Sequence, residues 1–580
     1  MRWWLVVALV AGCSRGQLGI DTGEATSSPS SSTDTDTHTD PDTDTDTDTD
    51  TDTGGDPSDV LFDPGRAIEV RIEMDPADWD TLRLQSRSYV SLFGGDDCME
   101  APFESPYTWF PASAEVDGVS YDLVGVRKKG LIGSASTTKP GLKLDLDEFV
   151  ENPNLHGLDK LTLNNSVQDP SYVRQCIAYQ VLADAGIEAP RCGFAHVWLN
   201  GEDLGLYVHV ERIGRDFLRK RFDDDSGSLY EGTLSDFRDG WTGTFEPKTD
   251  DTDEDLGPIL DVVDALGASD DALGDALDEV VDLDAYINFW AAEVLVGHWD
   301  GYAGNTNNFY VYALPGDEGR LHFLPWGTDG TLVTWYGLYG VYAEGTLAHR
   351  LYGHPEYSAA FVQRMEELLQ TVWDEDALHE LLDVMEQTID EELGDDSGVE
   401  SAIDEVRWVV DTQRGAIESQ LGMSWPYDQR DIICMREVAH LSMEMSTTWG
   451  TFDSSPNWFT EGDTTITLNW EGVDVGFNTA GSVADFSHGT PVVLVAAEIS
   501  DGSLLMPYVY WLDQDMAADG VTLPIDGGSS DGAVQYTDAG MNWEWEVIGY
   551  LSDGTITFDS IGYSNGDPVN CTVDAAVYSW

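Results

Sequence analysis

The stretch that decides the fold is residues 161–211, "LTLNNSVQDPSYVRQCIAYQVLADAGIEAPRCGFAHVWLNGEDLGLYVHVE". It opens with "LTLNN", which predicts a strand with a polar end. A helix follows, because Asp169 is a suitable N-cap, Pro170 suits the first helical position, and Gly186 suits the position beyond the C-terminus. The order predicted for this stretch is therefore strand, helix and then hairpin.

The hairpin is predicted by Asn200 and Gly201, a pair that favours a tight two-residue turn between antiparallel strands. Side chains alternate between the two faces of a strand, so Leu206 and its alternate neighbours form an apolar face. Glu211 lies on the opposite face with Tyr207 and His209. A carboxylate at that position is able to orient a lysine, although a solvated strand face explains the pattern equally well.

Working outward, the chain divides into two folded regions. Residues 60–422 mix strands such as "AIEVRIEM" with helical stretches, several of them acidic. Residues 427–580 contain short apolar strands separated by Gly, Asp and Ser, as in "TPVVLVAAEI" and "GTITFDSIGY", which predicts an all-β, sandwich-like domain. The fold class expected for the whole chain is α+β.

The N-terminus carries a compact secretory signal, "MRWWLVVALVAGCSRG". Its apolar run is too short to span a bilayer. "LVAGC" resembles a bacterial lipobox, which implies a lipoprotein signal peptide over residues 1–13, whose Cys13 is lipidated and becomes the mature N-terminus. Residues 14–58 are of low complexity, with Asp-Thr alternation over 33–53, and are expected to be a disordered spacer rather than a calcium site.

The charge of the chain limits its partners. There are 108 acidic and 28 basic residues, a formal net charge of −80. Such a surface repels nucleic acid and anionic membranes, so neither is an expected partner. Export permits disulfides, and five cysteines follow Cys13. Because Cys434 and Cys571 bracket the last region, we expect them to pair.

Two clusters in residues 60–422 are candidates for chemistry. The first is the loop "VRKKGLIGSASTTKPGLKL", which is rich in Gly and Ser and holds five basic residues within seventeen positions: Arg127, Lys128, Lys129, Lys139 and Lys143. A loop of this type binds phosphates through backbone N–H groups and lysine charge. In a chain this acidic, balancing of surface charge is the alternative explanation.

The second cluster comprises "HWDGYAGNTNNFYVY" and the later "LPWGTDG", which supply Asp300, Asn308 and Asp329 at the ends of predicted buried elements. Carboxylate and amide oxygens suit Mg²⁺ or Mn²⁺. An Asp, an Asn a few residues later and a second Asp follow the logic of a kinase metal site. Ordinary Asp and Asn turns are the alternative explanation.

In this order, "VGVRKKG", "LTLNNSVQDPSYVR", "NGEDLGLY", "HWDGYAGNTNNFYVY" and "FLPWGTD" resemble the motifs of the spore coat protein H (CotH) kinase family. The resemblance covers about 60–422. It implies a two-lobed, atypical protein-kinase-like domain that uses ATP with Mg²⁺ or Mn²⁺ to phosphorylate Ser or Thr of a protein substrate outside the cytoplasm.

By the same resemblance, Lys129 is the lysine that contacts ATP phosphates, with Lys128 as an alternative. Lys139 is a further candidate phosphate ligand because it belongs to the same basic loop. Glu211 is the partner of that lysine. Asp300 is the catalytic base or a metal ligand, Asp329 is a metal ligand, and the loop asparagine is Asn308 or Asn305. Gly327 departs from the family, because many members carry an aspartate there.

The function expected is that of an exported, metal-dependent kinase anchored to an outer membrane or cell surface through lipid on Cys13. The alternative is a surface adhesin or scaffold that has lost the activity, a reading that Gly327 favours. The β-rich domain is expected to contact surface glycan or a surface protein.

Overall fold

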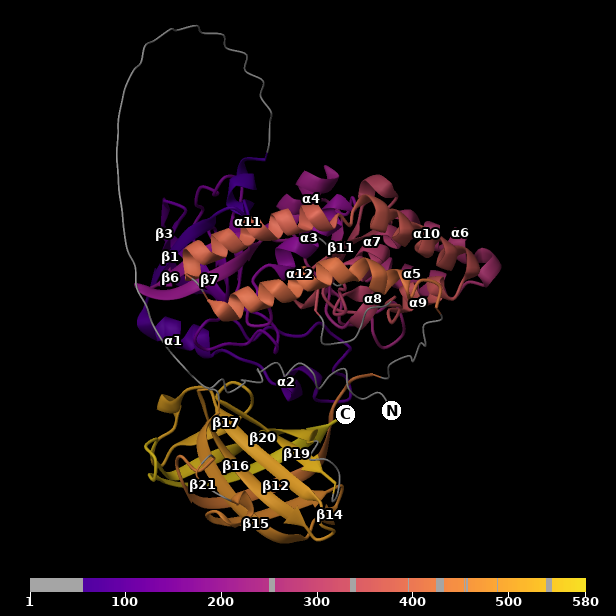
Figure 1. Ribbon diagram of the computed structural model, residues 1–580. Helices are drawn as coiled ribbons and strands as arrows, with labels where there is room; N and C mark the ends of the chain where they lie inside the picture. Colours follow the sequence, from indigo (N-terminus) through magenta and orange to yellow (C-terminus); the bar gives the residue numbers. More distant parts are fainter. Residues whose placement is uncertain are drawn as a thin grey trace, which may run out of the picture.

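Figure 1 shows the computed structural model of the chain, which describes residues 56–249, 256–333, 341–394, 396–423, 432–452, 454, 457–487, 489–538 and 545–580. The expected signal sequence, Cys13 and residues 14–55 of the expected spacer lie outside these ranges. Residues 56–58 were expected to belong to the spacer. They are ordered instead, because Pro57–Phe62 forms a short helix (η2) capped by the Asp56 side chain, which accepts from the Ser58 N–H.

The first lobe is a closed barrel whose strand order is β1-β2-β3-β4-β5-β7-β6. Alternate residues along these strands point into one apolar core, for example Ile68, Val70 and Ile72 of β1. The strands are β1 (Ala67–Met74), β2 (Phe110–Val116), β3 (Val119–Lys129), β4 (Gly141–Asp145), β5 (Lys160–Asn164), β6 (Cys192–Leu199) and β7 (Glu202–Val210).

The hairpin prediction is confirmed, since β6 and β7 pair antiparallel around Asn200 and Gly201, both with positive φ. Two small helices follow β1: α1 (Pro76–Leu84), which packs on β3, and α2 (Tyr89–Phe93), whose apolar side chains pack against the C-terminal part of the chain. The Asp75 side chain caps α1 by accepting from the Ala77 N–H.

Helix α3 (Arg174–Asp184) begins later than the sequence predicts. Tyr172 has a φ of +64°, a left-handed conformation that interrupts a helix. The Asp169 carboxylate still accepts from the backbone of Arg174 at 3.0 Å, so it stabilises the first turn from outside the helix. At the other end Gly186 has a φ of +77°, as the prediction required.

The second lobe is mainly helical and contains a four-stranded sheet in the order β11-β10-β8-β9. Its strands are β8 (Ser228–Gly232), β9 (Glu246–Pro247), β10 (Phe309–Ala313) and β11 (Leu321–Pro325). Its helices are α4 (Arg215–Phe222), α5 (Gly257–Leu266), α6 (Leu273–Asp278), α7 (Leu283–Leu295), α8 (Tyr302–Asn305), α9 (Thr346–Tyr352), α10 (Pro355–Thr371), α11 (Glu375–Leu393) and α12 (Ser397–Glu418). Helix α7 is buried nearly all round and lies at the centre of this core.

Helices α11 and α12 run along both lobes (Figure 1). The Thr388 hydroxyl of α11 donates to the Pro64 carbonyl at 2.9 Å, and Glu392 contacts His196 of β6 at 2.6 Å. Arg174 of α3 contacts Glu405 of α12 at 3.3 Å. The two contacts made by α11 hold the barrel side of the molecule against the helical lobe. None of the helices in the described parts of the chain is long and apolar enough to cross a membrane.

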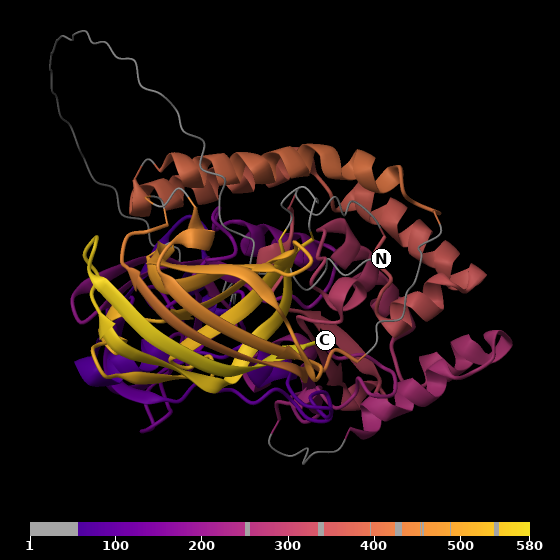
Figure 2. The ribbon, with the colours of Figure 1, turned by 90° about the horizontal axis from the view of Figure 1, so that it is seen from below.

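The C-terminal domain is built from one sheet, which has ten strands among the described residues. The sheet curls around one apolar core, so the expected sandwich-like domain arises from a single sheet (Figures 1 and 2). The strands are β12 (Arg436–Thr448), β13 (Asp463–Trp470), β14 (Val473–Asp474), β15 (Phe477–Ser487), β16 (Thr490–Ile499), β17 (Leu504–Trp511), β18 (Thr522–Ile525), β19 (Ser530–Thr537), β20 (Glu546–Ile561) and β21 (Pro568–Ser579).

This domain packs against the barrel side of the molecule through an apolar cluster that joins Tyr89 and Phe93 of α2 to Tyr550 of β20. A disulfide links Cys98 to Cys434 beside that cluster, and a second disulfide links Cys176 to Cys192. The predicted pairing of Cys434 with Cys571 is therefore wrong. The Cys571 side chain points into the core of the curled sheet and carries a free thiol.

Candidate active site

The basic loop begins where β3 ends, and the barrel separates its two neighbouring lysines. Lys128 points to the inner side, is 1% exposed, and donates from Nζ to the Arg83 carbonyl at 2.7 Å. It therefore caps helix α1. Lys129 points outward, on the face shared with Lys143 of β4, toward the second lobe. Of the two candidates only Lys129 lies near the acidic residues of that lobe.

Lys129 is held by an amide. Its Nζ donates to the Asn164 side chain at the end of β5, and the Asn164 Nδ2 donates to the Gln175 Oε1 of α3 at 2.8 Å. Burial lowers the pKa of Lys129 to about 8, against the opposing effect of the charges on Asp329 and Glu231. The cation is thus poised beside carboxylates without being neutralised by one.

Lys139 does not join this group. Its Nζ donates to the Leu206 carbonyl at 2.7 Å and to the Tyr172 hydroxyl at 3.0 Å, and it lies over the rings of Tyr172 and Tyr207. The side chain therefore ties the end of the basic loop to the barrel. The structure gives it no position beside Asp300 or Asp329.

Asp300 is enclosed by three side-chain amides. Its Oδ1 accepts from Asn305 at 2.6 Å and from Asn307 at 3.3 Å, and its Oδ2 accepts from Asn308 at 2.7 Å. Burial raises the pKa of Asp300, and these hydrogen bonds oppose the rise. Asn305 and Asn308, the two candidates for the loop asparagine, therefore both orient this carboxylate.

The loop that carries Asp300 is held in place by hydrogen bonds to Glu293 of α7. This buried carboxylate accepts from the Tyr302 N–H at 3.0 Å and from the Ala303 N–H at 3.1 Å. These are orphan donors at the start of the short helix α8, so a carboxylate at this position stabilises the turn. Sequence reasoning missed this role, because Glu293 stands inside an apolar helical run.

Asp329 reaches the same place from the adjacent strand. β10 and β11 pair with Phe309 opposite Pro325, which brings the ends of the two loops together. Burial raises the pKa of Asp329 to about 6, and the negative charges of Asp169 and Asp300 contribute, while its own backbone N–H and Lys129 oppose the rise. Two carboxylates whose negative charges act on each other where the two loops meet form a candidate cation site.

Gly327 is in contact with this site. Its φ is +56°, and a Cβ atom at this position would lie 2.6 Å from both Cγ and Oδ1 of Asn308. The residue before Thr328 therefore has no room for a side chain unless the Asn308 amide moves. This explains locally why glycine stands here, where the sequence resemblance leads one to expect an aspartate.

The expected partnership of Glu211 with Lys129 is contradicted. Glu211 is buried and accepts from Arg191 at 2.5 and 3.0 Å and from Arg221 at 3.2 Å. Arg191 also contacts Asp59 of η2, so this network closes the base of the hairpin. The polar face predicted for the second strand of the hairpin is buried, with Tyr207 and His209 both 0% exposed.

The carboxylate that faces the outward lysines is Glu231 of β8. It contacts Lys248 at 2.6 Å, and its charge acts on both Lys129 and Lys143. Burial lowers the pKa of Lys143 to about 7, with Glu231 opposing the shift. Nothing in "SLYEG" distinguishes Glu231 from an ordinary strand residue, so only the pairing of β8 with β10 reveals its position.

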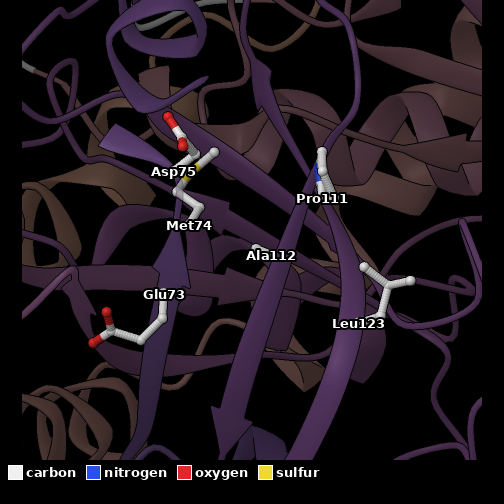
Figure 3. Close-up of a pocket in the computed structure, with 6 residues that line it drawn as sticks. All are labelled: Glu73, Met74, Asp75, Pro111, Ala112 and Leu123. Carbon is white, nitrogen blue, oxygen red and sulfur yellow. The ribbon is translucent and has the colours of Figure 1, made fainter. Parts of the chain in front are cut away.

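The side chains gathered here carry oxygen atoms of the kind that a hard divalent cation binds. They are the carboxylates of Asp300 and Asp329 and the amide oxygen of Asn308, whose amide nitrogen donates to Asp300 at 2.7 Å. A cation here would also offset the negative charge of Asp300, which adds to the rise that burial causes in the pKa of Asp329. By contrast, a depression of about 390 Å³ on the barrel (Figure 3), which includes Glu73, Asp75 and Leu123, shares no residue with this cluster.

Comparison with known proteins assigns the region. The family model for CotH kinase protein matches residues 126–419, which is just over half of the chain. Inner spore coat protein H of Bacillus subtilis is 24% identical over 247 residues, 39% of this chain and 66% of that protein. Invasin CotH2 of Rhizopus delemar is 21% identical over 243 residues, 37% of this chain and 41% of that protein.

Spore coat protein homolog 1 of Rhizopus delemar is 20% identical over 232 residues, 36% of this chain and 38% of that protein. This chain thus spans from 38% to 66% of the length of these three relatives. Among solved structures, the Helicobacter pylori proinflammatory kinase CtkA aligns with 48% of this chain and 91% of that chain, at 10% identity and a TM-score of 0.25. That likeness is too weak to support a conclusion.

Proposed function

Because this chain belongs to the CotH kinase protein family, we propose that it is a phosphotransferase that moves the γ-phosphate of ATP to a Ser or Thr hydroxyl of a protein substrate. The observation that carries the proposal is the grouping of Lys129, Asp300 and Asp329. Asn308 donates to Asp300 at 2.7 Å and its carbonyl accepts from Trp326, in the loop that carries Asp329, at 3.2 Å. The charge of Asp329 in turn acts on Lys129. A lysine for phosphates, an aspartate for the acceptor and an aspartate for a metal are the groups that phosphoryl transfer requires.

The residues have distinct roles in this reaction. Asp329 and Asn308 would hold Mg²⁺ or Mn²⁺, which supplies charge stabilisation to the phosphates when bound. Lys129 contacts the phosphates. Asp300 accepts the proton of the substrate hydroxyl while the oxygen of that hydroxyl forms a bond to the γ-phosphorus. The bond between the γ-phosphorus and the ADP oxygen breaks, and ADP leaves with that electron pair. The three amides around Asp300 aim its oxygens, and its raised pKa suits proton acceptance.

A second candidate function is that of a binding protein which keeps the fold without the activity. Gly327 supports this second function, because a glycine contributes no carboxylate beside Asn308. The C-terminal sheet would then carry the contacts with surface glycan or protein. We also propose export and lipid anchoring through Cys13, which the disulfides Cys98–Cys434 and Cys176–Cys192 support, since such bonds persist in oxidising compartments.

The test uses the whole chain, because the Cys98–Cys434 disulfide joins the C-terminal domain to the kinase domain. The protein is incubated with γ-labelled ATP, Mn²⁺ or Mg²⁺ and a Ser- and Thr-rich acceptor. Asp300→Ala and Asp329→Ala are compared with Asp261→Ala, an exposed aspartate of α5.

The proposal predicts metal-dependent phosphate transfer by the unaltered chain and by Asp261→Ala, and transfer at least tenfold slower in Asp300→Ala and Asp329→Ala. If the unaltered chain shows only the background transfer of those two variants, the binding protein is favoured. If all four proteins transfer phosphate well above background and at the same rate, the chemistry lies elsewhere in the chain.

A further inference from the structure

The side chain of Lys129 is connected to helix α3 by a row of two amides. Lys129 Nζ donates to the Asn164 Oδ1, and the Asn164 Nδ2 donates to the Gln175 Oε1 at 2.8 Å. Gln175 is 3% exposed, so its side chain is fixed by the packing of α3. The position of the Lys129 ammonium therefore depends, through Asn164, on a buried residue of α3.

The chemistry of the three groups sets the direction of this row. A lysine ammonium has three donors and no acceptor, so it requires the oxygen of the Asn164 amide. That choice turns the Asn164 nitrogen toward α3, where it requires an acceptor, and the Gln175 oxygen supplies one. Rotation of either amide would place donor against donor or acceptor against acceptor, so a single orientation is stable.

No carboxylate takes the place of this amide in the described parts of the chain. Glu211 is engaged by Arg191 and Arg221, and Asp329 and Glu231 act on Lys129 through their charge rather than through a direct ion pair. A neutral acceptor orients the ammonium but leaves its charge available. A carboxylate at hydrogen-bond distance would instead compete with phosphate oxygens for the same donors.

We propose that Asn164, held by Gln175, is the positioning residue that aims Lys129 at the phosphates of the nucleotide, in the role the sequence assigned to a glutamate. This rests on the proposed function. The same Gln175 also contacts the loop that carries the metal-binding aspartate, because its carbonyl accepts from the Thr328 hydroxyl at 3.5 Å. Gln175 therefore links the position of Lys129 to the loop that ends in Asp329.

The first experiment measures binding of Mn²⁺·ADP to the whole chain by calorimetry. Asn164→Leu removes the acceptor and is expected to weaken binding at least tenfold, and Gln175→Leu about fivefold. Gln175→Glu keeps an acceptor for Asn164 and is expected to restore most of the affinity. Asn165→Ala is the matched contrast, because Asn165 donates to the loop carbonyls of Ser134 and Lys139 and not to Lys129.

The second experiment needs no nucleotide. The rate at which an amine reagent labels Lys129 is followed against pH by mass spectrometry, which reports the midpoint of its titration. Asn164→Leu is expected to shift that midpoint to lower pH and Asn164→Asp to higher pH, while Asn165→Ala leaves it in place. Asn164→Asp keeps a polar side chain and so tests the idea if Asn164→Leu fails to fold.

The outcomes separate the two proposals. If the unaltered chain binds no Mn²⁺·ADP but the labelling midpoints shift as expected, the orienting row exists and the proposed kinase function fails. If the unaltered chain binds Mn²⁺·ADP but Asn164→Leu and Asn164→Asp change neither affinity nor midpoint, the positioning role is wrong. A loss in Gln175→Glu equal to that in Gln175→Leu would also overturn it.

Discussion

Replacing Gly327 by alanine is predicted to destabilise the kinase domain and to displace the Asn308 amide from Asp300. Two features of the structure combine at this position. The backbone has a φ of +56°, which an L-residue adopts at a cost, and a Cβ would lie 2.6 Å from the Asn308 amide. The backbone cannot yield easily, because Trp326 next to it is held by a hydrogen bond from its N–H to the Asn308 carbonyl at 3.2 Å.

The magnitude follows from these two features. The left-handed conformation costs a non-glycine residue about 1 kcal/mol. The Asn308 amide must also move, which breaks its 2.7 Å hydrogen bond to the Asp300 carboxylate. A hydrogen bond to a charged group contributes about 1.5–3 kcal/mol. We therefore expect Gly327→Ala to lower the free energy of unfolding by about 3 kcal/mol.

The assay is urea unfolding of the whole chain, followed by tryptophan fluorescence, for Gly327→Ala, Asn308→Gly and the double variant. In the Asn308→Gly background the obstructing amide is gone, so Gly327→Ala should cost only the conformational part, about 1 kcal/mol. The difference between the two backgrounds isolates the contact with Asn308. Gly327→Asp meets the same obstruction, so it should reduce rather than increase phosphotransfer.

Two results would refute this reasoning. One is a Gly327→Ala variant as stable as the unaltered chain, within about 0.5 kcal/mol, which lies inside the range of ordinary surface substitutions. The other is an equal loss in both backgrounds, since that would mean that the Asn308 amide is not the obstruction.

Three further predictions concern the frame of the site. The Cys98–Cys434 disulfide joins two cysteines that are 336 residues apart in the sequence. Removing it should cost about 2–5 kcal/mol of stability and so lower the unfolding temperature of the C-terminal domain in calorimetry. An unchanged thermogram would contradict this prediction. The pKa of His196 is raised because hydrogen bonds to two carboxylates outweigh the opposing effect of burial. Its stabilisation is therefore complete below about pH 6.5 and is lost as the pH rises through the raised pKa, so the thermal midpoint should fall more steeply over that range than in His196→Gln. Lys128→Met should lower the stability of the chain and leave its nucleotide affinity unchanged. Lys129→Met should lower the nucleotide affinity and leave the stability unchanged. Equal losses of affinity in the two variants would mean that both lysines contact the nucleotide.

Local patterns predicted the elements well where one short segment determines the geometry. Asn200 and Gly201 form the hairpin turn, and Gly186 ends α3, because both depend on backbone conformations that few residues adopt. The start of α3 was misplaced by the left-handed Tyr172, for which neither Tyr nor its neighbours give a sequence signal. Lys129 lies where the charge of Asp329 acts on it, but no pattern in the sequence indicates its contact with Asn164.

Pairings between distant segments were the part that the sequence did not determine. Glu211 was predicted to meet a lysine, but Arg191 lies next to the same hairpin base and reaches it first. Glu231 became visible only when β8 was placed beside β10. The partner of Cys434 depends on how the curled sheet docks on α2, and sequence order does not reveal that arrangement.

The most direct test of the central claim is a Mn²⁺ titration of the whole chain by electron paramagnetic resonance, with and without ADP. A chain with a net charge of −80 is expected to bind Mn²⁺ at many surface carboxylates. Only the Mn²⁺ binding that depends on ADP therefore reports on the site formed by Lys129, Asp300 and Asp329. The account predicts one additional bound Mn²⁺ per chain when ADP is present, lost in Asp329→Asn and in Lys129→Met. Mn²⁺ binding that is the same with and without ADP, or that is unchanged in both variants, would contradict it.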